Sequence, residues 1–133
     1  MSFEKNKFQV VKKKRLQKSE FNVECNVPVE AEIDKIFSVC HTAQVENAEI
    51  LNGIVNFNGN IDFCILYQGV DGEILTINSS CPFSSKFEDS QLSVGDKVGI
   101  SCEVVDYSID SVTSSNIKIN CVIQQKGVII FCK

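Results

Sequence analysis

The feature that most constrains the fold is an alternation of apolar and polar residues that recurs along the chain. Between residues 21 and 29, apolar side chains occupy every second position, and Asn22, Glu24 and Asn26 lie between them. A period of two places successive side chains on opposite faces of a β-strand. Similar runs continue to the C-terminus, separated by turn residues. The pattern predicts an all-β fold, an antiparallel β-sandwich or barrel of about eight or nine short strands.

The clearest turn signal is Asn58-Gly59, which stands between two apolar runs. Both residues tolerate positive φ, so the pair predicts a type I′ turn between two strands. Further turns are expected at 69–72 and 94–96, a connection at 82–87, and a break at Gly127. The expected strands cover residues 21–29, 39–45, 50–57, 60–68, 73–79, 97–108, 116–125 and 128–132.

Residues 29–37 form the segment whose pattern also fits a helix. Ile33, Ile36 and Phe37 share one helical face, and acidic residues occupy the first turn, where the helix dipole favours them. Ala31 and Ile33 also continue the alternation, so an extended conformation stays open. We expect one short helix or helical turn near 29–37.

Charge divides the chain into a basic arm and an acidic body. Residues 1–20 carry seven basic and two acidic side chains, whereas residues 21–133 carry six basic and fifteen acidic ones. A length of 133 residues suits one domain, so we expect an arm at 1–20 and a single β domain at 21–133. The arm's apolar residues are Phe3, Phe8, Val10, Val11 and Leu16, and its basic patch is Lys12, Lys13, Lys14 and Arg15.

Such an arm has several possible roles. It can be solvated, bind nucleic acid or an anionic membrane surface, or dock on an acidic neighbour such as a second copy of the body. The acidic body argues against nucleic acid as a partner. No apolar run reaches the roughly 18 residues of a membrane span, and the charged N-terminus lacks the apolar stretch of a secretion signal.

The cysteine count is seven, so at least one thiol has no partner within the chain. No two cysteines have C-x-x-C spacing and there is one histidine, so we expect no metal site and no cofactor. Strand parity places three cysteines on apolar faces as core residues, Cys25, Cys102 and Cys121, and leaves Cys64 ambiguous. The candidates for disulfides between chains lie near the ends of predicted strands, with inert reduced thiols as the alternative: Cys40, Cys81 and Cys132.

No catalytic grouping is recognisable in the sequence. Cys40 and His41 are adjacent, so on a strand their side chains point to opposite faces, which argues against a nucleophile pair. The aromatic residues Phe57, Phe63 and Tyr67 alternate in phase with core positions, which favours packing over ligand stacking. We therefore expect no catalytic residues and no enzyme activity.

Residues 48–88 resemble the central part of the SPOCS domain, also described as DUF3794. The resemblance rests on Ile65-Leu66-Tyr67 at a strand end, Pro82-Phe83 after the next strand, and the Gly95-Asp96 turn. Residues 27–36 are similar to the family's segment of proline, alanine and isoleucine. The resemblance covers residues 21–125, essentially the whole body.

The resemblance implies a non-enzymatic assembly module of the spore envelope, in the coat, exosporium or an appendage. The family occurs in endospore-forming Firmicutes, and its best-known member carries tandem copies and a C-terminal LysM domain. This chain has one copy and no LysM pattern, so peptidoglycan binding is not carried over. By the same resemblance, the protein is made in the mother-cell cytoplasm and deposited on the spore surface.

We hypothesise that the arm docks on a neighbouring copy by adding a strand to a sheet edge. If repeated docking of copies does not close into a ring, it gives a filament; if it closes, it gives a homo-oligomer. The candidate thiols can then lock the assembly, and other spore-envelope proteins are further possible partners. The alternative is a module that binds a glycan or an anionic partner, although the absence of Trp disfavours a glycan site.

Overall fold

The computed structural model describes residues 13–131, and all regular structure in this range is β-strand. Six long strands form two three-stranded antiparallel sheets, with orders β1-β6-β5 and β2-β3-β4. The strands are β1 (Lys13–Pro28), β2 (Ile33–Leu51), β3 (Ile54–Gly69), β4 (Ile74–Glu88), β5 (Lys97–Val112) and β6 (Asn116–Phe131). The all-β, antiparallel prediction is confirmed. The strands are fewer and longer because several predicted turns lie inside continuous strands.

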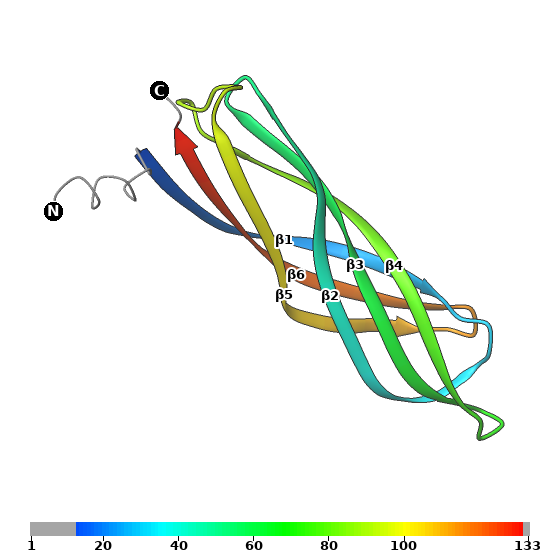
Figure 1. The fold of residues 1–133 in the computed structure, drawn as a ribbon. Coiled ribbons are helices and arrows are strands. Elements are labelled where there is room, and N and C mark those ends of the chain that lie inside the picture. The colour runs from blue at the N-terminus through cyan, green and yellow to red at the C-terminus, as the bar shows by residue number, and fades with distance from the viewer. Residues whose placement is uncertain (1–12, 132–133) are drawn as a thin grey trace, which may run out of the picture.

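The two sheets are formed by different parts of the chain. The central part folds as the meander β2-β3-β4, and β6 returns between β1 and β5. Figure 1 shows the sheets crossing at an angle, with β2 beside β5 and β4 beside β1. Residues 13–20, the second part of the predicted arm, pair with β6 residues 124–131 as the first half of β1.

The core lies between the sheets and is filled mainly by their central strands. In β3, Ile61 and Ile65 are fully buried, and in β6 so are Ile117, Ile119 and Ile123. Each such side chain stabilises the fold by roughly 1.5–3 kcal/mol relative to exposure. The predicted core aromatics are also buried: Phe57, Phe63 and Tyr67.

The predicted turn at Asn58-Gly59 is wrong, because this pair lies in the middle of β3. The turn between β2 and β3 is the earlier Asn-Gly pair, Asn52-Gly53, whose φ angles are 52° and 77°. Asn58 accepts a hydrogen bond from the Asn47 amide across the sheet. Both Asn-Gly pairs carry the same local turn signal, so the choice between them depends on cross-strand contacts.

The predicted helix near residues 29–37 is also wrong. The chain bends after Pro28, and β2 begins at Ile33. Ile33 and Ile36 lie against the core, and register shifts at 33–35 and 36–38 set the spacing that resembled a helical face. A β-bulge adds one residue to a strand and so disturbs the period of two.

The other two predicted interruptions also belong to continuous strands. Pro82 lies in β4, an edge strand with β3 on one side only. Proline has no N–H to donate, and an edge strand tolerates this because half of its backbone groups have no partner strand. Gly127 lies within β6, and the Phe87 ring packs over it. A Cβ at this position would be 2.7 Å from the ring, so only glycine fits without a shift. Glycine here marks a close packing contact, not a turn. The predicted turns at 69–72 and 94–96 do separate strands.

Candidate functional site

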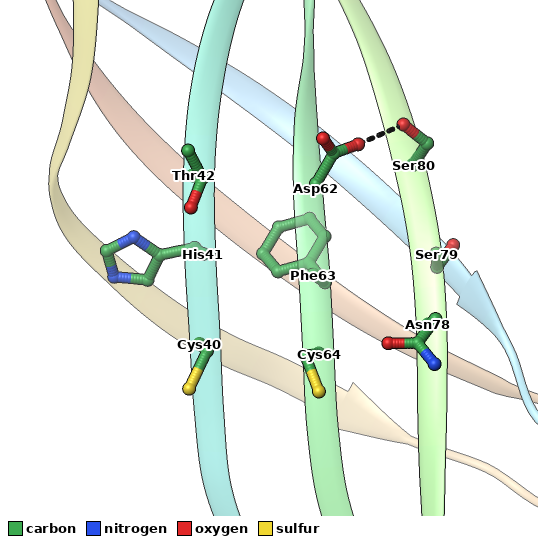
Figure 2. Close-up of a pocket in the computed structure, with 9 residues that line it drawn as sticks. All are labelled: Cys40, His41, Thr42, Asp62, Phe63, Cys64, Asn78, Ser79 and Ser80. Carbon is green, nitrogen blue, oxygen red and sulfur yellow. Dashed lines mark hydrogen bonds between the residues drawn. The ribbon is translucent and has the colours of Figure 1, made fainter.

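The outer face of the β2-β3-β4 sheet carries a hollow of about 440 Å³. Two rows of exposed side chains cross all three strands there, because the register places their residues opposite one another. We call this region the outer hollow. The rows are Thr42, Asp62 and Ser80, and Cys40, Cys64 and Asn78, as Figure 2 shows.

The chemistry of the outer hollow is polar and thiol-based. Ser80 Oγ donates a hydrogen bond to Asp62 Oδ1, drawn in Figure 2. His41 points away from Cys40, and its ring meets that of Tyr107 on β5 edge-on, with 5.3 Å between centroids. The separation of Cys40 from His41 therefore follows the parity expectation, and the two do not form a nucleophile pair.

A second unusual surface lies at the C-terminal half of β5, the edge of its sheet. Residues 105–112 are all exposed. Tyr107 and Ile109 lie opposite the fully buried Cys121 and Ile119 of β6, yet are 36% and 38% exposed. β2 thus covers this end of the inner sheet face only in part, through the contact of His41 with Tyr107. We call it the apolar edge, formed by Val105, Tyr107, Ile109 and Val112.

The structure brings two cysteines together across the edges of the sheets. Cys25 of β1 and Cys81 of β4 form a disulfide, with 5.8 Å between their Cα atoms. Cys25 is buried, as parity predicted. Cys81 was expected to be available for a link between chains, but here its sulfur is engaged within its own chain.

The remaining thiols of residues 13–131 divide into two kinds. Cys40 and Cys64 are exposed, whereas Cys121 is buried and Cys102 is half-buried. Burial raises the pKa of Cys102 to about 11 and also raises the pKa of Cys121, because desolvation disfavours the thiolate. These two thiols therefore stay protonated near neutral pH, as suits core residues.

Much of the predicted arm lies outside the described residues, namely Phe3, Phe8, Val10, Val11 and Lys12, as does Cys132. Lys13 begins β1. Lys14 and Leu16 are exposed, Leu16 to 69%. The assembly roles of these residues stay predictions.

Arg15 of the predicted basic patch has a structural role. Its guanidinium donates to Asp89 Oδ2 at 2.6 Å and to Gln91 Oε1 at 2.8 Å, and it lies 5.5 Å from the Phe131 ring centroid. The Asp89 side chain is 1% exposed. A buried carboxylate needs a partner to offset its lost hydration, so Arg15 joins the start of β1 to the loop after β4.

We expect Arg15→Ala to lower the free energy of unfolding by about 2 kcal/mol, because Asp89 would lose its charged donor. The matched control is Lys14→Ala at the neighbouring exposed position, with an effect within about 0.5 kcal/mol. Urea denaturation of both variants measures the difference. Equal stabilities would show that the ion pair contributes nothing.

Sequence reasoning missed the pairing of Cys40 with Cys64. A two-residue turn at Asn52-Gly53 by itself would place Cys40 opposite Ile65. The register shift between Val45 and Asn47 moves the partner to Cys64. The Asn52-Gly53 pair indicates the turn in the sequence, but no residue pattern indicates the register shift between Val45 and Asn47.

These features define the class of protein. The described residues form an all-β module, and among them no three His, Cys, Asp or Glu side chains are grouped to hold a metal ion. A family model described as "SipL, SPOCS domain" matches residues 32–112, more than half of the chain. The chain therefore belongs to the SPOCS domain family, and the resemblance seen in the sequence is confirmed.

The family is non-catalytic and indicates a sporulation-associated role. No curated protein and no solved structure matches the chain. Across residues 13–131, no helix has the length and apolar character needed to cross a membrane.

Proposed function

We propose that this protein is a non-enzymatic structural component of the bacterial spore envelope that self-associates. Residues 1–12, the part of the basic arm that precedes β1, add to the apolar edge of β5 in the next copy. The family supports the sporulation context. The observation that carries the assembly step is the apolar edge, an exposed strip of inner sheet face along the free edge of β5.

The apolar edge offers an acceptor of defined chemistry. Its exposed apolar side chains alternate with Asp106, Ser108 and Asp110, so one side of the strand is apolar and the other acidic. Among the described residues, neither Asp106 nor Asp110 forms an ion pair with a Lys or Arg. A basic, partly apolar strand is the complementary partner.

The arm has the matching sequence. Phe8 and Val10 fall on one face of an extended strand, and Lys5 and Lys7 fall on the other. Antiparallel addition can therefore place apolar against apolar side chains and lysine near aspartate. Cross-strand pairs of both kinds stabilise a sheet.

The other sheet edges are less suitable. β4 contains Pro82 and is joined to β1 by the Cys25–Cys81 disulfide. β1 ends in Pro28, and prolines hinder the addition of a strand to an edge. Register shifts do not separate the remaining two edges, because β2 has three and β5 has two. β5 is the edge that combines an acidic side with an exposed apolar side.

The intrachain disulfide supports an extracytoplasmic destination. Disulfides persist in oxidising surroundings and are rare in the cytosol. A protein made in the mother cell would meet such surroundings after the cell lyses and the spore surface is exposed. The Cys25–Cys81 bond is compatible with that end point.

Deleting residues 2–12 tests the donor. This deletion leaves β1, which begins at Lys13, intact together with Arg15. We expect the full-length protein to form oligomers or filaments in reductant and the deletion variant to remain monomeric by sedimentation velocity. Higher salt should weaken assembly of the full-length protein, because screening reduces the attraction between lysine and aspartate. Unchanged assembly after deletion would refute the docking step.

Charge substitutions test the acceptor. Ile109→Lys and Val112→Lys place a cation where the basic arm should bind, and we expect each to weaken assembly at least about tenfold. Val94→Lys is the matched control, because Val94 is 74% exposed in the loop before β5. Equal assembly of all three variants would show that the arm docks elsewhere.

A further inference from the structure

Two exposed cysteines face each other across neighbouring strands of the outer hollow. Cys40 of β2 and Cys64 of β3 are direct partners in the antiparallel register. Figure 2 shows both side chains on the same face of the sheet, with Asn78 completing the row. Both thiols are free and exposed. The pair is thus reachable by a small molecule from solvent.

The register places the Cα atoms of the two cysteines at a separation that a disulfide can span. Residues directly opposite in an antiparallel pair have Cα atoms about 4.5–5.5 Å apart. Disulfides form with Cα separations of roughly 4.4–6.8 Å, and the Cys25–Cys81 bond spans 5.8 Å. A bond between Cys40 and Cys64 therefore needs side-chain rotation, with no change in strand pairing.

The two other free thiols of residues 13–131 are less suited to the same chemistry. Cys121 is buried, and burial raises the pKa of Cys102 to about 11. The thiolate is the attacking species in disulfide exchange, so a protonated thiol reacts slowly. Exposure and pairing together single out Cys40 and Cys64.

We propose that Cys40 and Cys64 form a dithiol site that reacts with low-molecular-weight disulfides and closes into an intrachain disulfide. One thiolate attacks a sulfur of the small disulfide, giving a mixed disulfide and releasing one small thiolate. The second cysteine, once deprotonated, attacks the protein sulfur of that mixed disulfide and releases the second small thiolate. Two protein thiols are oxidised, one small disulfide is reduced to two thiols, and the protons pass to the released thiolates.

The proposal changes the role expected for Cys40. A thiol with a partner on the neighbouring strand reacts intramolecularly, at a much higher effective concentration than with a second chain. Oxidation at the outer hollow therefore ends within one chain. This inference is independent of the arm, because the outer hollow lies on the other sheet from the apolar edge.

Glutathione disulfide is a suitable probe, and the sequence allows direct mapping of the product. Glu46 and Glu49 lie between the two cysteines, so cleavage after glutamate places them on separate peptides. We expect the oxidised full-length protein to yield these two peptides joined by a disulfide. It should carry no glutathione at either cysteine and should run as a monomer on a non-reducing gel.

Single substitutions remove the second step. In Cys40→Ser and Cys64→Ser, we expect the remaining cysteine to retain glutathione, because no neighbour resolves the mixed disulfide. Cys102→Ser is the matched control and should still give the joined peptides. Circular dichroism verifies that each variant is folded. Glutathione retained on both cysteines of the native protein, or dimers linked through Cys40 or Cys64, would overturn the proposal.

Discussion

In oxidising buffer, Cys81→Ser is expected to lower the free energy of unfolding by about 4 kcal/mol. The Cys25–Cys81 bond closes a loop of 56 residues, and closing a loop of that size removes about that much chain entropy from the unfolded state. The bond also joins β1 to β4, two edge strands of different sheets. Its loss frees the two sheets to separate at this side.

Reduction supplies the control for this prediction. Cys25 remains buried in Cys81→Ser as a small apolar side chain, so the core is little changed. In a phosphine reductant, the native protein and the variant should therefore have free energies of unfolding within about 0.5 kcal/mol. Denaturant titrations in both buffers measure the two differences. Equal stability in oxidising buffer would show that the bond is not formed.

Gly59→Ala is expected to destabilise the protein by about 3 kcal/mol, at the upper end of overpacking effects. A Cβ at position 59 would overlap the backbone carbonyl oxygen of Gln44 and lie 2.9 Å from the Phe83 ring. Backbone cannot move aside as a flexible side chain can, so the pairing of β2 with β3 must shift. Thermal and urea unfolding measure the loss.

The chain offers a matched glycine for comparison. Gly99 lies in β5, and a Cβ there would meet nothing within 4 Å. Gly99→Ala should be neutral or stabilising by roughly 0.5–1 kcal/mol, because alanine loses less backbone entropy on entering a strand. A loss at Gly99 as large as that at Gly59 would contradict the explanation by close approach.

The sequence and the structure agree best on which side chains are buried. Ile61, Phe63 and Ile65 alternate with polar residues, and the structure buries all three. Parity is a local property of an extended chain and needs no knowledge of the partner strand. The family could also be recognised locally, from the order of short motifs that the SPOCS match covers.

Turn positions were predicted less well, because the same residue type serves more than one purpose. Asn52-Gly53 and Asn58-Gly59 have the same turn chemistry, but only the first lies at a turn. At the second, glycine allows the Gln44 carbonyl to approach. Likewise, Gly127 accommodates the Phe87 ring. These contacts involve distant residues and leave no local signal.

The sequence by itself determined that the chain is an antiparallel β protein of the SPOCS family, and which side chains form its core. Only the tertiary structure decided which cysteines meet. Cys25 and Cys81 are neighbours because two sheet edges cross, and Cys40 faces Cys64 because a register shift displaces the pairing by one residue. Parity depends on each residue's own strand, whereas partnership depends on how separate strands are placed relative to one another.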